Sequence, residues 1–544
     1  MTKKTFLYGA AILTVSGIVS KILGAVFRIP LGNIIGAEGM AYYQVAYPIY
    51  VLLLTVSIAG TPVAISRMVS EKIAFGDYYG AHRIFKVVLT MMAFVGVALS
   101  AVLYFGAGLF TGLTAGLDEA VYAMRAIAPA LLFVTVLSVF RGFFQGMQNM
   151  RPTAIIQVME QLFRVGVGLT MAIFLLPLGK PSAAAGATLG ATAGAAGGLL
   201  FAFLIYRAVR KSKLFTQRLR ESRHTHLDAY GRQEPASGIL GTFFLIALPI
   251  MVGAAVMPIM NNIDLFIVTR RLADTGMTEE AVRALYGQLT GFAAPLINLP
   301  QVVTQAIAIS LVPTVVTALK TDDREFLQHN VVLSMRTTLI IALPCTVGLF
   351  ALAEPIMRLL YARQLEDAVS AAPSLTILAV GIVFLASIQT LTGILQGIER
   401  QFIPVVNLII GACCKGALTW VLTGIPSVNI KGAAIGTVCA YVVATTLNLL
   451  AVRRHTGARF GWAQTLGKPL AAALVMGLLA FGLHRLLLPL AGNGIATLAA
   501  ISAGALAYFV LLFALKSVTE EELALLPKGQ KLARLYRRFA RRGR

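Results

Sequence analysis

Two cations stand in an apolar stretch near the start of the chain, at Lys21 and Arg28. They are seven residues apart, so on a helix they share one face about two turns apart. A charge at the centre of a bilayer costs roughly 3 kcal/mol on insertion scales. We therefore expect both side chains to line a water-filled cavity and to meet an anionic group. For Arg28, extension to the membrane interface is an alternative, because long basic side chains do this near helix ends.

Three further charged residues lie within apolar segments. Glu160 and Arg164 are four residues apart, the spacing at which opposite charges on one helix pair. Pairing would neutralise them; otherwise Arg164 would add to the anion site and Glu160 would serve ion coupling. Lys415 has Gly411 one turn before it rather than an acidic residue, so its charge needs another partner. We expect Lys415 to face the cavity.

An acidic residue, Asp264, stands beside Asn261 and Asn262 in another apolar segment. A carboxylate with amides nearby suits a bound cation, a proton site or an ion pair with Lys415. The sequence leaves these three alternatives open.

Motifs typical of catalysis are absent from the sequence. It contains no GxxxxGK[ST], GxSxG, HExxH or CxxC pattern. The acidic pairs Glu279–Glu280 and Glu366–Asp367 are explained by solvated loop charge. We expect neither an enzyme nor a cofactor, and coupling to Na⁺, to H⁺ or to the membrane potential stays open.

The composition excludes a soluble protein. Of 544 residues 58% are hydrophobic and only 13% charged, and the mean hydropathy is +0.80. Apolar runs long enough to span a bilayer recur along the chain. They do not alternate as the strands of a membrane β-barrel would. We predict an all-α polytopic membrane protein.

The apolar runs predict about 14 transmembrane helices. Six precede a basic stretch: Phe6–Phe27, Ala41–Met68, Ile84–Gly108, Glu119–Gln145, Thr153–Leu176 and Ser182–Ala208. Six follow it: Ile239–Thr269, Ala284–Ala318, Asn330–Leu352, Ala368–Gln396, Phe402–Thr423 and Asn429–Val452. Two more are Leu466–Leu488 and Gly494–Lys516.

The formal charge is +23, from 46 basic and 23 acidic residues, and most of the basic residues lie between the apolar runs. The cations gather in alternate loops and in the tail, which predicts that the N- and C-termini both lie on the cytoplasmic side of the membrane. They also predict contacts of the basic linker and tail with anionic lipids. We do not expect nucleic acid as a partner, and we expect a monomer.

An internal repeat divides the predicted helices. Four residues match four others 251 positions later: Gly142, Gln145, Gly146 and Arg164 match Gly393, Gln396, Gly397 and Lys415. The repeat predicts two six-helix lobes related by a pseudo-twofold axis, with the substrate site between them. The predicted divisions are an N-terminal lobe 1–208, a linker 209–238, a C-terminal lobe 239–452, two additional helices 453–516 and a tail 517–544.

Several stretches together resemble the multidrug/oligosaccharidyl-lipid/polysaccharide exporter superfamily, and within it the stage V sporulation protein B and MurJ-like flippase group. They are SKILGAVFRIPLGNIIGAEGMAYYQ, AGTPVAISR, PIMNNIDLFIV and LYGQLTGFAAPLINLPQVV. The resemblance implies a flippase for an undecaprenyl-pyrophosphate-linked sugar. It places the group's first-helix basic residues on Lys21 and Arg28, and a cation site of some relatives near Asp264 and Asn407.

A flippase for a lipid-linked cell-wall precursor, lipid II or a related saccharide, also suits the charges. A pyrophosphate needs cations, and sugars need a wet cavity. The alternative is a cation-coupled multidrug exporter of the same superfamily, which would favour acidic cavity residues over Lys21, Arg28 and Lys415.

Overall fold

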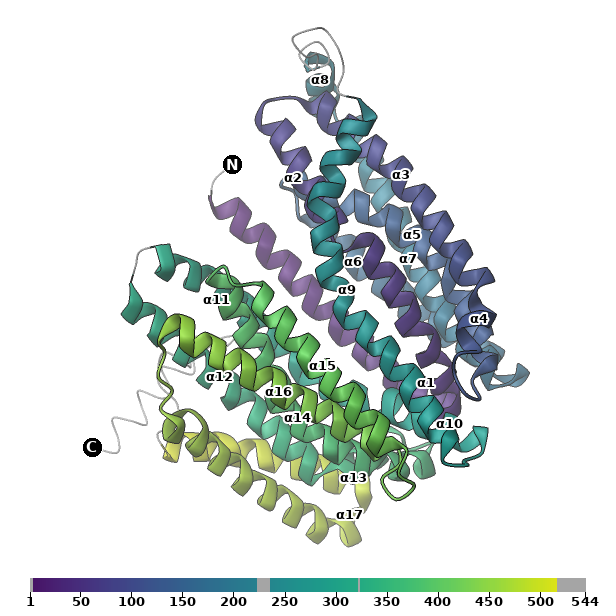
Figure 1. Cartoon of the computed structure of the whole chain (residues 1–544), viewed down its shortest axis with the longest axis vertical. Coiled ribbons are helices and arrows are strands. Elements are labelled where there is room, and N and C mark those ends of the chain that lie inside the picture. The colour runs from purple at the N-terminus through teal and green to yellow at the C-terminus, as the bar shows by residue number, and fades with distance from the viewer. Residues whose placement is uncertain (1–2, 223–234, 321–322, 516–544) are drawn as a thin grey trace. The chain divides into compact units, whose positions relative to one another are not determined.

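In a computed structural model the described residues, 3–222, 235–320 and 323–515, fold into helices without a strand (Figure 1). They form two compact units, Met1–Gly291 and Phe292–Arg544. The predicted all-α architecture is confirmed.

The N-terminal unit begins with the long helix α1 and includes most of the chain's short helices. Its longer helices are α1 (Lys3–Ile58), α2 (Thr61–Ala74), α3 (Tyr78–Phe105), α5 (Val121–Gly146), α6 (Arg151–Leu175), α7 (Lys180–Lys211) and α9 (Ala236–Asp274). Its shorter ones are α4 (Ala107–Thr111), η1 (Asp118–Ala120), η2 (Leu176–Leu178), α8 (Lys213–Glu221) and α10 (Glu279–Gly287).

The C-terminal unit follows a π-helix, η3 (Gln288–Ala293), in which the division between the units falls. Its helices are α11 (Ala294–Lys320), α12 (Arg324–Ala351), α13 (Ala353–Leu360), α14 (Leu365–Gly397), α15 (Phe402–Thr423), α16 (Lys431–Thr456), η4 (Ala463–Gly467) and α17 (Lys468–Ala514).

Two helices are kinked at a glycine. Gly36 in α1 has φ 68° and ψ −177°, and Gly492 in α17 has φ 71° and ψ 170°. Glycine adopts a positive φ without the steric cost that a Cβ imposes. The predicted end of the first helix at Phe27 is wrong, because the helix continues through Arg28 and Pro30 to the kink.

Eleven stretches of the described residues are long and apolar enough to cross a membrane. Two of them, Val15–Ala74 and Ala463–Ala514, each overlap two predicted helices. The predicted helix Ala284–Ala318 corresponds to η3 and α11 and is not among the eleven. The polytopic character is confirmed, and the number 14 stays a prediction.

The bounds of four helices follow the internal repeat of the sequence. Helix α5 ends at Gly146 and α14 at Gly397, while α6 begins at Arg151 and α15 at Phe402. Both pairs are 251 residues apart in the sequence. The bounds of these four helix ends therefore repeat at the spacing of the four matched residues, as the predicted equivalence of α6 and α15 requires.

The turns that join these helices are also alike. Gln148 has φ 56° and Glu399 has φ 62°, an unusual conformation for residues other than glycine. The amide of Gln148 donates to the Gln145 carbonyl at 2.9 Å, and that of Glu399 donates to the Gln396 carbonyl at 3.1 Å. The same turn therefore closes both halves of the repeat.

Aromatic rings hold together α3, α5 and α7 in the N-terminal unit. The ring of Phe85 lies with its centroid 5.2 Å from Phe140, 4.7 Å from Phe143 and 5.0 Å from Tyr206. All four residues are buried. Such contacts add to the dispersion energy that packs helices inside a membrane.

Glycines bring α6 and α7 into close contact. A Cβ on Gly190 would lie 2.5 Å from the Gly168 Cα and 2.6 Å from the Arg164 carbonyl oxygen. A Cβ on Gly194 would lie 2.6 Å from the Glu160 carbonyl oxygen. Because small residues let membrane helices approach closely, α7 fixes the position of the α6 segment that carries Glu160 and Arg164.

Charged residues surround the start of the second half of α1, just after the kink at Gly36. The carboxylate of Glu38 lies 2.9 Å from the Lys180 Nζ and 3.3 Å from the Arg283 Nε. Arg283 also donates to the Gly116 carbonyl at 3.0 Å. These contacts tie α10 to α1 and α7 within the N-terminal unit.

The compact units do not coincide with the predicted lobes, because α9 and α10 belong to the N-terminal unit. Part of the predicted linker 209–238 is helix α8, whose Phe215 packs edge-on against Tyr78 with ring centroids 6.3 Å apart. Residues 223–234 of the linker and the tail 517–544 lie outside the described residues. The predicted domain boundaries were drawn from the sequence repeat, and they stay predictions.

Candidate functional site

One face of α6 carries four polar side chains. They are Gln157, Glu160, Gln161 and Arg164, at the spacing i, i+3, i+4 and i+7 that aligns side chains along a helix. The first half of α1 packs against this face. Ser16 Oγ donates to Gln157 Oε1 at 3.3 Å, and Ser20 Oγ lies 3.4 Å from the Gln157 carbonyl.

Two arginines share the carboxylate of Glu160. Arg141 Nη2, from α5, lies 2.5 Å from one carboxylate oxygen, and Arg164 Nη2 lies 3.4 Å from the other. The Glu160 side chain is 10% exposed, that of Arg141 21% and that of Arg164 16%. The predicted pair of Glu160 and Arg164 is present, and Arg141 gives the group a net positive charge.

Three tyrosines from the second half of α1 lie near Arg164, and one of them also contacts Arg28. The ring centroids of Tyr43 and Tyr47 are 5.8 Å apart, and those of Tyr47 and Tyr50 are 6.0 Å apart. The Arg164 guanidinium acts electrostatically on all three hydroxyls. The Arg28 Cζ lies 5.9 Å from the centre of the Tyr47 ring, within the range of a cation–π contact.

These residues form one polar group in the apolar interior of the unit, which we call the arginine–tyrosine cluster. Its members are Arg28, Tyr43, Tyr47, Tyr50, Arg141, Glu160 and Arg164. Three guanidiniums therefore accompany one carboxylate. Guanidinium groups bind phosphate and carboxylate oxygens through several parallel hydrogen bonds, so the cluster is suited to an anion.

Several buried polar atoms of the cluster and its neighbour Gln161 lack a hydrogen-bond partner among the described residues. They are Tyr50 Oη, Arg141 Nε, Arg164 Nε and Gln161 Oε1. A buried donor without an acceptor costs about 1–3 kcal/mol. Three of the four atoms can donate, so water or an anionic ligand would satisfy them. No group of three His, Cys, Asp or Glu residues that could hold a metal occurs in the described part.

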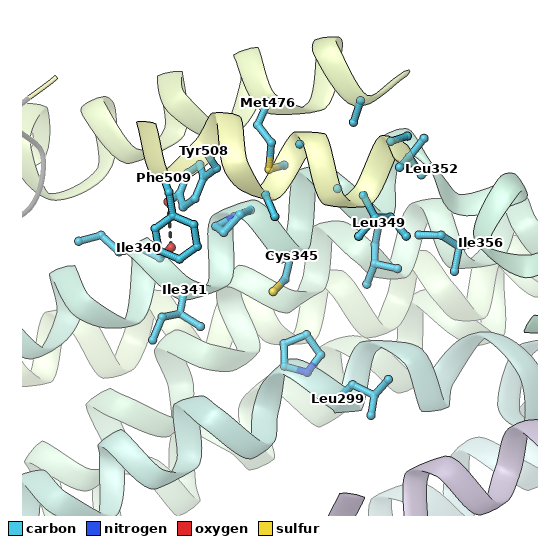
Figure 2. A pocket seen from close by; sticks show the side chains of 18 of the residues that line it. Leu299, Ile340, Ile341, Cys345, Leu349, Leu352, Ile356, Met476, Tyr508 and Phe509 are labelled. Carbon is cyan, nitrogen blue, oxygen red and sulfur yellow. Dashed lines mark hydrogen bonds between the residues drawn. The ribbon is translucent and has the colours of Figure 1, made fainter. Parts of the chain in front are cut away.

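An apolar cavity of about 540 Å³ lies within the C-terminal unit (Figure 2). Its walls come from α11, α12, α13 and α17, with Leu299, Ile341 and Leu349 among the lining residues. Tyr508 also lines it, and its hydroxyl donates to the Ile340 carbonyl at 2.8 Å. Because that hydroxyl is satisfied, the wall presents mainly hydrocarbon.

Comparison with known proteins assigns the chain to a family. Residues 6–319 match the family described as polysaccharide biosynthesis protein. The chain is a member of this family. It is 28% identical over 532 residues to stage V sporulation protein B of Bacillus subtilis (strain 168), covering 97% of this chain and 98% of the relative.

A second relative and a solved structure agree with this assignment. The lipid II flippase MurJ of Bacillus subtilis (strain 168) is 30% identical over 466 residues, covering 83% of each chain. The structure of a lipid II flippase MurJ in an inward closed conformation superposes with a TM-score of 0.67 at 17% identity, covering 92% of this chain and 98% of that one. The predicted polytopic membrane fold and the flippase resemblance are confirmed.

The structure brings three of the predicted site residues together, since Arg28, Glu160 and Arg164 all belong to the cluster. Lys21 lies on α1 next to Ser20, and its side chain lies outside what the structure describes. Lys415 lies half-buried on α15 in the C-terminal unit. The predicted binding roles of these residues stay predictions.

The residues predicted for ion coupling have separate surroundings. Asp264 lies half-buried on α9 and acts electrostatically on the Tyr286 hydroxyl of the same unit. Asn407 lies in the C-terminal unit, where its Nδ2 donates to Asn448 Oδ1 at 2.8 Å. That bond joins α15 to α16, so the Asn407 amide has a structural role.

The sequence analysis missed Arg141. This residue immediately precedes Gly142 of the repeated GxxQG motif, within an apolar helix. Its equivalent in the second half of the repeat is Thr392. The sequence therefore contained a signal for Arg141, because one copy of the repeat has a charge where the other copy has none.

Proposed function

We propose that this protein is an alternating-access flippase that moves a polyprenyl-pyrophosphate-linked cell-wall precursor across the cytoplasmic membrane. The observation that carries this proposal is the arginine–tyrosine cluster, a net positive group enclosed in a polytopic membrane protein. Membership of a polysaccharide biosynthesis family and likeness to a lipid II flippase support it. The precursor is lipid II or a related lipid-linked saccharide.

Each part of such a substrate has a partner of matching chemistry. The arginines supply the fork of donors that phosphate oxygens prefer. Tyr47, which is half-buried and backed by the buried ring of Tyr43, offers an aromatic ring of the kind that suits the apolar faces of sugars. The cavity in the C-terminal unit, taken by itself, has a hydrocarbon lining of the kind that an apolar chain prefers. Lys21 and Lys415 would add cations along the path.

The alternative of a cation-coupled drug exporter is less well supported. A site for organic cations needs unpaired carboxylates, whereas the one carboxylate of the cluster is held by two arginines. Asp264, Asn407 and Glu160 remain the residues proposed for Na⁺ or H⁺ coupling. We also propose cytoplasmic termini, contacts with anionic lipids through the basic linker and tail, and a monomer.

The proposal is tested by complementation in a bacterial strain depleted of its lipid II flippase. The intact chain should restore growth, and Lys21→Ala and Arg28→Ala should each abolish rescue while the protein stays in the membrane. Arg358→Ala is the control, because Arg358 lies on α13 in a surface pair with Glu354 and is 43% exposed. Full rescue by both test variants would contradict a role of these cations in substrate binding.

A second measurement separates the two transport functions. Expression of the chain should leave the resistance of cells to cationic dyes unchanged while it rescues growth. Dye resistance without rescue would favour the drug exporter.

A further inference from the structure

We propose that Glu160 is a resident counter-anion, which holds Arg141 and Arg164 in the empty transporter and is displaced by the pyrophosphate group of the substrate. This inference rests on the proposed function, and it assigns Arg141 to the binding site. It describes an exchange of one anion for another at the same two guanidiniums.

The geometry of the group favours an exchangeable pair. Each arginine contacts a different oxygen of Glu160, so neither guanidinium makes the parallel two-bond contact that gives the strongest pairing. The 3.4 Å contact of Arg164 is near the upper limit for a hydrogen bond. The Nε atoms of both arginines lack a partner among the described residues. Donors for a larger anion are therefore already in place.

The charges explain why a carboxylate should occupy the site when no substrate is bound. Without Glu160, Arg28, Arg141 and Arg164 would be three partly buried cations without its counter-charge, which is unfavourable in a membrane interior. One carboxylate reduces this cost and leaves net positive charge. A pyrophosphate carries more negative charge and more oxygens than a carboxylate, so it competes successfully for the same donors.

The displaced carboxylate also has a polar neighbour. Gln157 lies three residues before Glu160 on the same face of α6, within reach along a helix. Its amide can donate to the carboxylate once the arginines turn to the substrate. The exchange therefore needs only side-chain rotation on α5 and α6.

The test measures binding of inorganic pyrophosphate to the purified full-length protein in nanodiscs by equilibrium dialysis. Glu160→Gln removes the competing charge and should bind pyrophosphate about tenfold more tightly than the unmodified chain. Adding Arg141→Gln to this variant should abolish the gain. The matched control is Glu354→Gln, which removes a glutamate paired four residues away with Arg358 at the surface and should leave binding unchanged.

A second variant keeps the inference testable if Glu160→Gln does not fold. Arg141→Gln alone retains the neutral pair of Glu160 and Arg164, and it should bind pyrophosphate about tenfold more weakly than the unmodified chain. Unchanged affinity in a folded Glu160→Gln protein, or in Arg141→Gln, would overturn the exchange.

Failure of the proposed function gives a different result. If the intact chain does not rescue flippase depletion while Glu160→Gln still gains affinity for pyrophosphate, the exchange stands and the flippase assignment falls. If the chain rescues and Glu160→Gln gains nothing, only the exchange falls.

Discussion

Helices α5 and α6 in the N-terminal unit and α14 and α15 in the C-terminal unit share one backbone design and differ in chemistry. In both pairs the first helix ends at the second glycine of GxxQG, and a left-handed residue follows two positions later. The polar positions differ. The N-terminal pair has Arg141, Glu160 and Arg164, where the C-terminal pair has Thr392, Gly411 and Lys415.

The difference shows that turn geometry and site chemistry are set by separate residues. The turn depends on local backbone hydrogen bonds, which are the same in both halves. The chemistry depends on which residues stand near the end of the first helix, as Arg141 does, and on one face of the second. A repeated scaffold can therefore hold two arginines paired with a glutamate in one half, while the equivalent three positions of the other half hold one cation, Lys415.

Among variants that test the difference between the two helix pairs, we expect the largest effect from removing the carboxylate of Glu160. Glu160→Ala leaves two largely buried arginines without their counter-charge and should lower the free energy of unfolding by about 3–5 kcal/mol. Replacing Arg141 and Glu160 together by the Thr and Gly of the other half should recover much of this loss. Denaturant unfolding in mixed micelles measures the free energy of unfolding of both variants. A double variant as unstable as Glu160→Ala would contradict the view that Glu160 stabilises the protein by compensating the charge of Arg141.

The next effect concerns the glycine contact between α6 and α7. Gly190→Leu would place side-chain atoms against the backbone at Gly168 and Arg164, and should cost about 3 kcal/mol. The equivalent position in the other half is Tyr441, and there the two helices approach at other glycines, such as Gly411, where a Cβ would lie 2.8 Å from the Ala440 carbonyl oxygen. Gly166→Leu is the control, because Gly166 lies on α6 and a Cβ there would meet open space. Equal thermal stability of the two variants in detergent would disprove the close-packing argument.

A smaller effect is expected in the C-terminal unit. Asn407→Ile introduces the residue found at the equivalent position, Ile156, and removes the hydrogen bond to Asn448. Hydrogen bonds between membrane helices contribute on the order of 1 kcal/mol, so the midpoint of thermal unfolding should fall slightly. Thr446→Ala, an exposed residue bonded to its own helix, should leave the midpoint unchanged. A large loss of transport with unchanged stability would instead indicate a coupling role for Asn407.

The smallest effect tests the shared turn itself. Gln148→Gly and Glu399→Gly should each stabilise the protein, by up to about 1 kcal/mol, because glycine adopts positive φ without steric cost. The two gains should be similar if the turns are equivalent. Asn149→Gly serves as the control, since Asn149 is not among the residues with positive φ. Destabilisation by only one of the two glycines would show that the turns differ.

Sequence reasoning predicted the features that depend on composition and on spacing along one helix. Helix content, the repeat and the pairing of Glu160 with Arg164 all follow from such local patterns. It did not predict contacts between helices. The position of Arg141 beside Glu160 depends on how α5 packs against its neighbours, which periodicity does not determine. The kink at Gly36 was also missed, because a single glycine in an apolar run does not reveal its φ.

The apolar cavity of the C-terminal unit has a consequence for chemical inhibition. Its volume of about 540 Å³ lies in the range that drug-sized molecules fill, and its walls are nearly all hydrocarbon. A lipophilic compound bound there would act without competing for the arginines of the N-terminal unit. Cys345 lines the same cavity (Figure 2), so such a compound would contact its sulfur beside the hydrocarbon walls.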